Sequence, residues 1–249
     1  MERRRLEDDL HALVATELER RGFLVAFSER TGGTSEGPYR SLNLGFRTDD
    51  DPDRVRSNRE ALRRGLGVPR FLTARQVHGV TVARATSAGD PEKPLAEGDV
   101  LEVTERHLAV GVLVADCVPV ALVSEAEGRL VAVHAGWRGL ARGIVARAAS
   151  LFASPAEVWA AVGPAVGPCH YPVGPEVAGA VGEGSPAAID RGDGDLRLDL
   201  AGTAVAALEA EGIRLVEATD LCTACQEDRF FSHRRDGRTG RQAMIAMRL

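Results

Sequence analysis

The stretch LVADCVPVALV, residues 113–123, places the carboxylate of Asp116 beside the thiol of Cys117 in an otherwise apolar run. Charged side chains are rarely buried without a partner, and a thiolate is a good metal ligand. His78 precedes this run in RQVHGV, and His134 follows it in VHAGWRGL. Two imidazoles and one thiolate would make a three-ligand zinc site with a fourth position open to water, which is typical of catalytic zinc.

A predicted β-hairpin would bring the thiol and one imidazole together. If Val123 pairs with Gly128 across the loop SEAE, paired positions sum to 251 and Cys117 falls opposite His134. Opposite residues on one face have Cβ atoms ~4.5–5.5 Å apart, which suits a shared metal ion. The second strand then turns into a helix, where free N–H groups and the charge of Arg138 would favour an anion.

The remaining elements follow from periodicity and from turn residues. Leucines and a valine at helical spacing predict an amphipathic helix at the N-terminus, and Asp199 is expected to cap a later helix. Helices are expected over residues 3–20, 52–67, 139–153 and 200–211. Strands are expected over 23–30, 71–85 with a break at Gly79, 108–123, 129–135, the start of 158–174, and either side of an Asp-Gly turn in 230–249. Strands and helices mix without strict alternation, which predicts an α+β fold with largely antiparallel sheets, as a single domain over 1–249.

The composition excludes several classes of function. A net charge of −5 and a pI near 5.7 do not favour nucleic acid or anionic membrane as partners. The charged N-terminal segment lacks the apolar core of a signal peptide, so a cytoplasmic protein is expected, with its four cysteines as thiols or metal ligands rather than disulfides.

The other cysteines form a weaker pattern. Cys222 and Cys225 make one C-x-x-C pair without a second pair, and a structural role is the simpler interpretation. Cys169 and His170 are adjacent, so their side chains are expected to diverge on an extended chain. His233 is expected to lie in a strand.

Three motifs in this order, QVHG, ADCVPV and HAGWRG, resemble the laccase-domain family, also called the polyphenol oxidase or purine nucleoside phosphorylase family. The resemblance continues upstream in SERTGGTSEGPYRSLNLG and downstream in GPAVGPCHYPVG and FFSHRRDGRTGRQ, so it covers nearly all of the chain from about residue 23.

The resemblance implies a catalytic zinc ion held by His78, Cys117 and His134, with copper as the alternative metal. It implies a four-layer α/β/β/α fold. It also implies phosphorolysis of adenosine, inosine and methylthioadenosine, and deamination of adenosine.

For these activities we expect Arg138 to hold phosphate and the amides of Asn43 and Gln76 to bind the base or the ribose. Arg30 and Arg40 are weaker phosphate candidates, and surface positions are the simpler interpretation of both. Asp116 is expected to orient an imidazole or to point to the other side of the strand.

Three other functions stay open at this point. Cys117 with His134 as its base would suit a cysteine-type hydrolase, and the family includes an attribution of hydrolytic editing of peptidoglycan precursors. Copper-dependent polyphenol oxidation is an older attribution in the family. A non-catalytic nucleoside-binding protein would use the same three residues only to stabilise its fold. The sequence does not indicate an oligomeric state.

Overall fold

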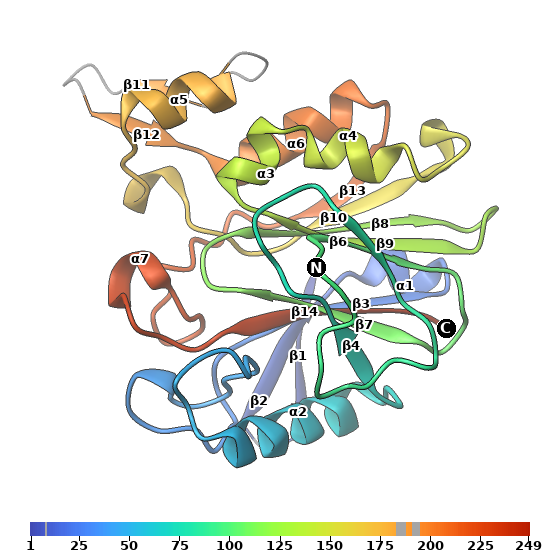
Figure 1. The fold of residues 1–249 in the computed structure, drawn as a ribbon, viewed down its shortest axis with the longest axis vertical. Helices are drawn as coiled ribbons and strands as arrows, with labels where there is room; N and C mark the ends of the chain where they lie inside the picture. The colour runs from blue at the N-terminus through green and yellow to red at the C-terminus, as the bar shows by residue number, and fades with distance from the viewer. Residues whose placement is uncertain (8, 183–187, 191–194) are drawn as a thin grey trace.

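The computed structural model describes residues 1–7, 9–182, 188–190 and 195–249. Within these residues the chain forms two six-stranded mixed sheets, a short two-stranded ribbon and seven α-helices. The two large sheets lie face to face, and helices cover their outer surfaces (Figure 1). The prediction of an α+β fold is therefore confirmed. No helix in these ranges is long and apolar enough to cross a membrane.

The first sheet contains both ends of the chain. Its strands, in order across the sheet, are β1 (Glu2–Glu7), β2 (Leu10–Val14), β3 (Phe23–Ser28), β14 (Gln242–Arg248), β7 (Ala109–Val114) and β4 (Phe71–Thr73). Neighbours are antiparallel, except that β4 runs parallel to β7. Helix α2 (Pro52–Leu66) covers the outer face; it begins where Asp51 accepts a hydrogen bond from the Asp53 N–H, and it confirms the helix predicted over 52–67.

The second sheet has parallel pairs at both edges. Its strands, in order, are β13 (Arg214–Ala218), β10 (Trp159–Val162), β8 (Val118–Ser124), β9 (Arg129–Ala135), β6 (Val100–Val103) and β5 (Val82–Arg84). The helices on its outer face are α3 (Trp137–Ala141), α4 (Ile144–Ala149) and α6 (Leu200–Ala210) (Figure 1). The remaining elements are α1 (Thr16–Arg20), α5 (Pro175–Gly182), α7 (His233–Asp236) and the ribbon of β11 (Ala188–Asp190) and β12 (Leu196–Leu198).

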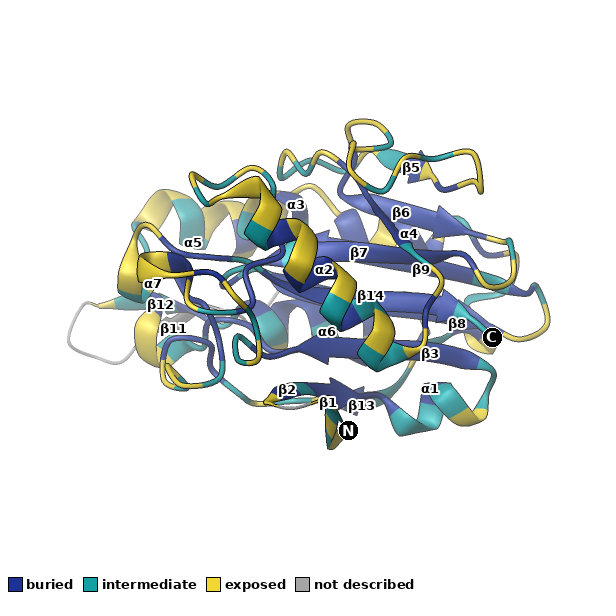
Figure 2. Cartoon of the chain, turned by 90° about the horizontal axis from the view of Figure 1, so that it is seen from below, coloured by how far each residue is buried: buried dark blue, intermediate teal, exposed yellow. Residues whose placement is uncertain are grey.

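The main apolar core lies between the sheets. Phe27, Val112 and Met244 of the first sheet pack in one buried cluster with Ala132 and Ala161 of the second. Two further clusters lie beneath α2 and beneath α4 and α6. Figure 2 shows the central strands of both sheets buried and most exposed residues on the helices, the loops and the edge strands. Burial of each large apolar side chain contributes about 1.5–3 kcal/mol, so this core fixes how the sheets sit on each other.

The helix predicted over residues 3–20 is wrong. The described residues of this segment form the β1–β2 hairpin, and α1 is the only helix among them. The leucine spacing misleads because β2 is buried on both faces, with Leu10 packing towards α2 and Leu13 packing between the sheets. Pairing of β2 with β3 outweighs the local pattern.

The apolar run 108–123 is two strands in different sheets. Strand β7 ends at Val114 in the first sheet, and β8 begins at Val118 in the second. A strand buried on both faces shows no alternation of polar and apolar residues, so the sequence does not mark where the chain crosses over. Asp116 and Cys117 lie in this crossover.

The helix predicted over residues 139–153 is interrupted. Gly143 has φ 72°, a left-handed conformation that separates α3 from α4. Asp199 caps α6 as predicted, because its side chain accepts a hydrogen bond from the Gly202 N–H at 2.8 Å.

The C-terminal segment differs from its prediction in its first half. Residues 230–232 are not a strand, and α7 follows them, capped by the side chain of Ser232. His233 therefore lies in a helix rather than in a strand. The last strand, β14, is confirmed.

Candidate metal centre

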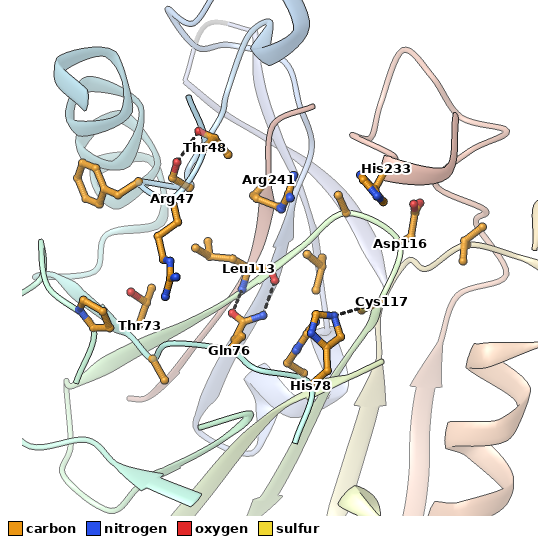
Figure 3. Close-up of a pocket in the computed structure, with 18 of the residues that line it drawn as sticks. Arg47, Thr48, Thr73, Gln76, His78, Leu113, Asp116, Cys117, His233 and Arg241 are labelled. Atoms are coloured by element: carbon orange, nitrogen blue, oxygen red, sulfur yellow. Dashed lines mark hydrogen bonds between the residues drawn. The ribbon is translucent and has the colours of Figure 1, made fainter. Parts of the chain in front are cut away.

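His78, Cys117 and His134 meet at one end of the two packed sheets. One ligand atom from each lies within 4.8 Å of the others. The Cys117 sulfur lies 3.8 Å from Nε2 of His78 (Figure 3). The two imidazole rings meet edge to face with centroids 4.9 Å apart. The structure thus brings together the three residues that the sequence singled out.

Two of these residues lie where the chain passes from one sheet to the other. His78 lies in the loop from β4 to β5, not on a strand as predicted, and Cys117 lies in the crossover from β7 to β8. His134 lies within β9, where its partner is Pro119 rather than Cys117. The predicted register is therefore wrong by two residues. An even slip keeps each side chain on its own face, and the thiol still faces the imidazole.

The backbone near the thiol adopts an uncommon conformation. His78 has φ 59° and Asp116 has φ 96°, both in the region that side-chain-bearing residues rarely adopt. Such conformations cost about 1–3 kcal/mol each and persist only where the surroundings impose them. At His78 a buried carboxylate imposes it.

That carboxylate is Asp99, which connects the two imidazole-bearing segments. It accepts a hydrogen bond from Nδ1 of His134 at 2.8 Å and bonds from the backbone N–H groups of His78 at 3.0 Å and Gly79 at 2.8 Å. The backbone N–H of Val77 donates to both carboxylate oxygens. The sequence analysis did not single out Asp99. This residue is the last of a polar connection, and its only distinguishing feature in the sequence is its position directly before the strand β6.

The charges of the site are tightly coupled in the metal-free protein. Burial raises the pKa of Cys117, but the charge and hydrogen bonds of His134 and His78 outweigh it and lower that pKa to about 6. Burial lowers the pKa of His134, but Cys117 and Asp99 outweigh it and raise that pKa to about 9. Burial likewise raises the pKa of Asp99, and its hydrogen bonds bring the net value below the usual range. The opposite shifts of these two pKa values favour a thiolate at Cys117 beside an imidazolium at His134.

These donors fit a soft divalent ion. Because Nδ1 of His134 donates to Asp99, its Nε2 is left as the ligand atom, which is the arrangement common among histidine ligands of metals. A thiolate with two imidazoles suits zinc or copper better than magnesium.

Asp116 does not orient an imidazole. Its Oδ1 accepts a hydrogen bond from the Thr223 hydroxyl at 2.6 Å, and its Oδ2 accepts one from the Arg234 N–H at 2.7 Å. Its backbone oxygen accepts from the Val166 N–H at 2.9 Å. Asp116 therefore ties the crossover to three other segments of the chain.

The three residues open into a cleft of about 800 Å³. Arginines are frequent in its lining, with Arg47, Arg138, Arg234 and Arg241 among them. This volume is within the range of small-molecule sites, roughly 300–1,000 Å³. The guanidinium of Arg138 stacks over Trp137 at 4.5 Å. The cleft is thus suited to an anionic or phosphorylated ligand.

The other residues predicted to contact substrate differ in whether they face the cleft, the protein interior or a separate surface hollow. Gln76 lines the cleft, but its amide exchanges two hydrogen bonds with the backbone of Leu113 (Figure 3). Asn43 is fully buried, and its Oδ1 accepts from the Arg241 N–H at 2.9 Å. Arg30 lies in a separate surface hollow with Arg40, whose backbone oxygen it binds.

A second group of metal-binding residues lies outside the cleft. The ligand atoms of Cys169, His170, Cys222 and Cys225 all lie within 4.8 Å of one another. The expectation that the side chains of Cys169 and His170 diverge is wrong, since Nδ1 of His170 lies 3.3 Å from the Cys169 sulfur. The partners that the C-x-x-C pair lacked in the sequence are supplied by a segment about fifty residues earlier.

Comparison with known proteins gives consistent matches along the chain. A family model described as multi-copper polyphenol oxidoreductase laccase matches residues 24–249. The purine nucleoside phosphorylase SCO2081 of Streptomyces coelicolor is 41% identical over 229 residues, covering 89% of this chain and 94% of that protein. The purine nucleoside phosphorylase YfiH of Escherichia coli is 37% identical, covering 90% and 93%. The crystal structure of YlmD from Geobacillus stearothermophilus aligns with a TM-score of 0.86 at 32% identity, covering 91% and 92%.

Proposed function

The chain belongs to the family described as multi-copper polyphenol oxidoreductase laccase, and from that premise we propose that it is a zinc-dependent purine nucleoside phosphorylase. The observation that carries the proposal is a three-residue metal cluster that opens into an arginine-lined cleft of about 800 Å³. The proposed substrates are adenosine, inosine and methylthioadenosine with phosphate, and relatives named purine nucleoside phosphorylase support them.

Phosphorolysis breaks the bond between the purine and C1′ of the ribose and joins phosphate to C1′. Positive charge develops on the ribose as the purine leaves, so the enzyme must hold the phosphate dianion close to C1′. Arginine suits this task because its guanidinium binds phosphate oxygens through two parallel hydrogen bonds. We assign phosphate binding to Arg138, which lines the cleft beside the metal cluster.

Gln76 and Asn43, which were predicted to contact the nucleoside, are better suited to positioning the walls of the cleft. The Gln76 amide holds the end of β7 at Leu113, and the Asn43 amide holds the backbone of Arg241. Because these amides are bound internally, we propose that they shape the cleft wall and that other atoms contact the nucleoside. Asp99 keeps the Nδ1 proton of His134 in place, so that Nε2 remains a ligand.

Zinc bound by His78, Cys117 and His134 would supply Lewis-acid chemistry in the cleft. Adenosine deamination is proposed as a second activity of the same site.

A cysteine hydrolase, such as an editor of peptidoglycan precursors, is the second candidate. It is favoured by the 3.8 Å contact between the Cys117 sulfur and Nε2 of His78 and by the low pKa of that thiol. A thiolate held by a metal is not a free nucleophile, so metal content separates the two candidates. Copper in place of zinc, with oxidation of phenols, would favour the polyphenol oxidase.

The decisive test combines elemental analysis with an inosine assay run with and without phosphate. We expect bound zinc, hypoxanthine release that requires phosphate, and loss of both activity and one zinc equivalent in Cys117→Ala. Metal-free protein that is inactive on inosine and whose Cys117 reacts rapidly with an alkylating agent would contradict the proposal and favour the hydrolase.

A further inference from the structure

We propose that a second zinc ion binds outside the cleft, in a closed site formed by Cys169, His170, Cys222 and Cys225. The cleft has three ligands and leaves a position open, whereas this cluster offers four protein ligands. Four-ligand Cys₃His sites are characteristic of structural zinc. The inference is independent of the activity proposed above.

The spacing of the ligand atoms fits one tetrahedral ion. Zinc bonds of about 2.3 Å to sulfur and 2.0–2.1 Å to nitrogen place ligand atoms roughly 3.5–3.8 Å apart around a tetrahedron. The Cys169 and Cys225 sulfurs lie 3.4 Å apart. Nδ1 of His170 lies 3.3 Å from the sulfurs of both Cys169 and Cys225 and 3.9 Å from that of Cys222. These four distances lie close to the tetrahedral separations, and all four ligand atoms lie within 4.8 Å of one another.

The backbone around the cluster supports this geometry. Cys222 and Cys225 have the two-residue spacing that is common among zinc ligands. The short 3₁₀ turn Pro168–His170 presents its two ligands to the same side. The Gly167 N–H donates to the Cys222 sulfur at 3.2 Å, a bond that supports a thiolate. A Cβ on Gly167 would lie 3.3 Å from the Cys222 Cβ and 3.4 Å from the Cys169 sulfur, so glycine permits this approach.

A disulfide between Cys169 and Cys225 explains less of the cluster. It would use two sulfurs and leave Cys222 and the imidazole of His170 without a reason to converge on them. A metal ion uses all four groups. It would also protect the exposed thiols of Cys169 and Cys225, since thiolates bound to zinc are not free to react.

The second ion would fix one wall of the cleft. It would join the segment after β10 to the segment after β13, which already meet where the Thr223 N–H donates to the Ala165 oxygen at 2.9 Å. Thr223 lies between two of the ligands, and its hydroxyl donates to Asp116, the neighbour of Cys117. Tyr171 directly follows His170 and lines the cleft. The cluster is therefore a positioning site for the crossover that carries Cys117.

The test counts zinc in the full chain, purified in reductant with zinc supplied. We expect about two zinc ions per chain in the wild type, and about one in each of Cys225→Ser and Cys117→Ala. The two variants serve as controls for each other. Cobalt replacing zinc in Cys117→Ala is expected to give strong thiolate-to-cobalt absorption and the visible bands of a tetrahedral ion, because three thiolates remain. This measurement does not require enzymatic activity, and it does not depend on whether a variant of the four-ligand cluster folds.

One zinc per chain in the wild type, lost in Cys117→Ala, would overturn the proposal. A Cys169–Cys225 disulfide found by peptide mass spectrometry of the reductant-purified, zinc-supplied protein would also overturn it. Two zinc ions in a protein that does not cleave inosine would support this site and contradict the proposed function, so the two failures are distinguishable.

Discussion

The Asp99 carboxylate and the His134 imidazole form a buried pair, with Oδ1 and Nδ1 2.8 Å apart and side chains 0% and 4% exposed. The same carboxylate binds the backbone of the loop that carries His78. One side chain therefore sets both the tautomer of one candidate ligand and the position of the other.

Asp99→Asn is expected to weaken zinc binding in the cleft about 10- to 100-fold, because partners of metal-bound histidines have effects of this size. An amide also offers N–H groups to backbone donors, and the unmade hydrogen bonds should cost about 1–3 kcal/mol of folding stability. Competition with a chromogenic chelator measures the first effect, and thermal unfolding measures the second. Asp90→Asn, at an exposed position, is the control. Unchanged zinc affinity would show that Asp99 only supports the loop.

Gly136→Ala is expected to crowd the metal site without straining the backbone. A Cβ there would lie 2.8 Å from Cδ2 of His78 and 3.1 Å from the Cys117 sulfur, while the glycine φ of −82° is accessible to alanine. Overpacking of this kind costs about 1–3 kcal/mol, so we expect zinc affinity to fall roughly tenfold or more. Gly179→Ala, where a new Cβ meets no neighbour, should bind zinc like the wild type. Equal zinc affinity in the two variants would contradict the close packing of Gly136 against His78 and Cys117.

Arg138→Ala is expected to raise the KM for phosphate about tenfold or more with a smaller effect on the KM for inosine. Hydrogen bonds to charged groups contribute about 1.5–3 kcal/mol, which corresponds to this range. Steady-state assays with each substrate varied in turn measure the difference. Arg142→Ala, exposed and one helical turn later, is the matched control. A change confined to the nucleoside KM would reassign Arg138 to the sugar or the base.

Alkylation of Cys117 in the metal-free protein should follow its lowered pKa. The thiolate is the reactive form, so the rate should rise with pH and reach half its maximum near pH 6 rather than near 9. Peptide mass spectrometry separates Cys117 from the other three thiols. His134→Gln removes the neighbouring charge and should move the midpoint upward. A midpoint of the wild-type alkylation rate near the ordinary thiol pKa would mean that no thiolate–imidazolium pair forms. In a separate measurement, added zinc should block alkylation of Cys117.

Glu29, which lies outside the cleft, should make the free energy of unfolding depend on pH. Burial raises its pKa, but hydrogen bonds from Arg3 and Arg229 outweigh this and the net pKa is lowered from 4.5. A lowered folded-state pKa stabilises the fold above the unfolded value, and this contribution is lost as the pH falls through the folded value. Glu29→Gln should therefore cost about 2 kcal/mol at neutral pH, and the difference from wild type should shrink below about pH 4.5.

Urea unfolding at several pH values measures this effect. Glu19→Gln is the comparison, because Glu19 pairs with Arg4 in a more exposed position and should cost less than about 1 kcal/mol. Equal costs for the two variants, or a Glu29→Gln cost that does not change with pH, would contradict the assigned role.

The sequence pointed to Cys117 and His134 because both residue types contrast with their surroundings. Cys117 and His134 interrupt runs that must be buried, and this contrast is visible without a structure. The exact register was not visible. Gly128 has φ 56°, which places it in the turn rather than in a pair with Val123, and this moved every pair by two positions.

The partners of these residues were harder to predict, because they depend on contacts between distant segments. Asp99 meets His134 across 35 residues and has no periodicity that marks it. The Cys169 and Cys225 sulfurs meet across 56 residues, a separation that local patterns do not encode. Likewise, the strand β2 appeared helical because its pairing with β3 is absent from any local window.

The crossovers between the sheets have a consequence for folding. Neither sheet alone contains all three residues of the cleft cluster, since His78 and Cys117 lie on two of the connections that link the sheets. The ion can bind tightly only after the sheets have docked, so binding and docking are linked and each strengthens the other. The affinity for the metal then depends on how the two sheets are positioned relative to each other. A change at Phe27 or Val112, which lie in the buried cluster between the sheets, is therefore expected to alter that affinity.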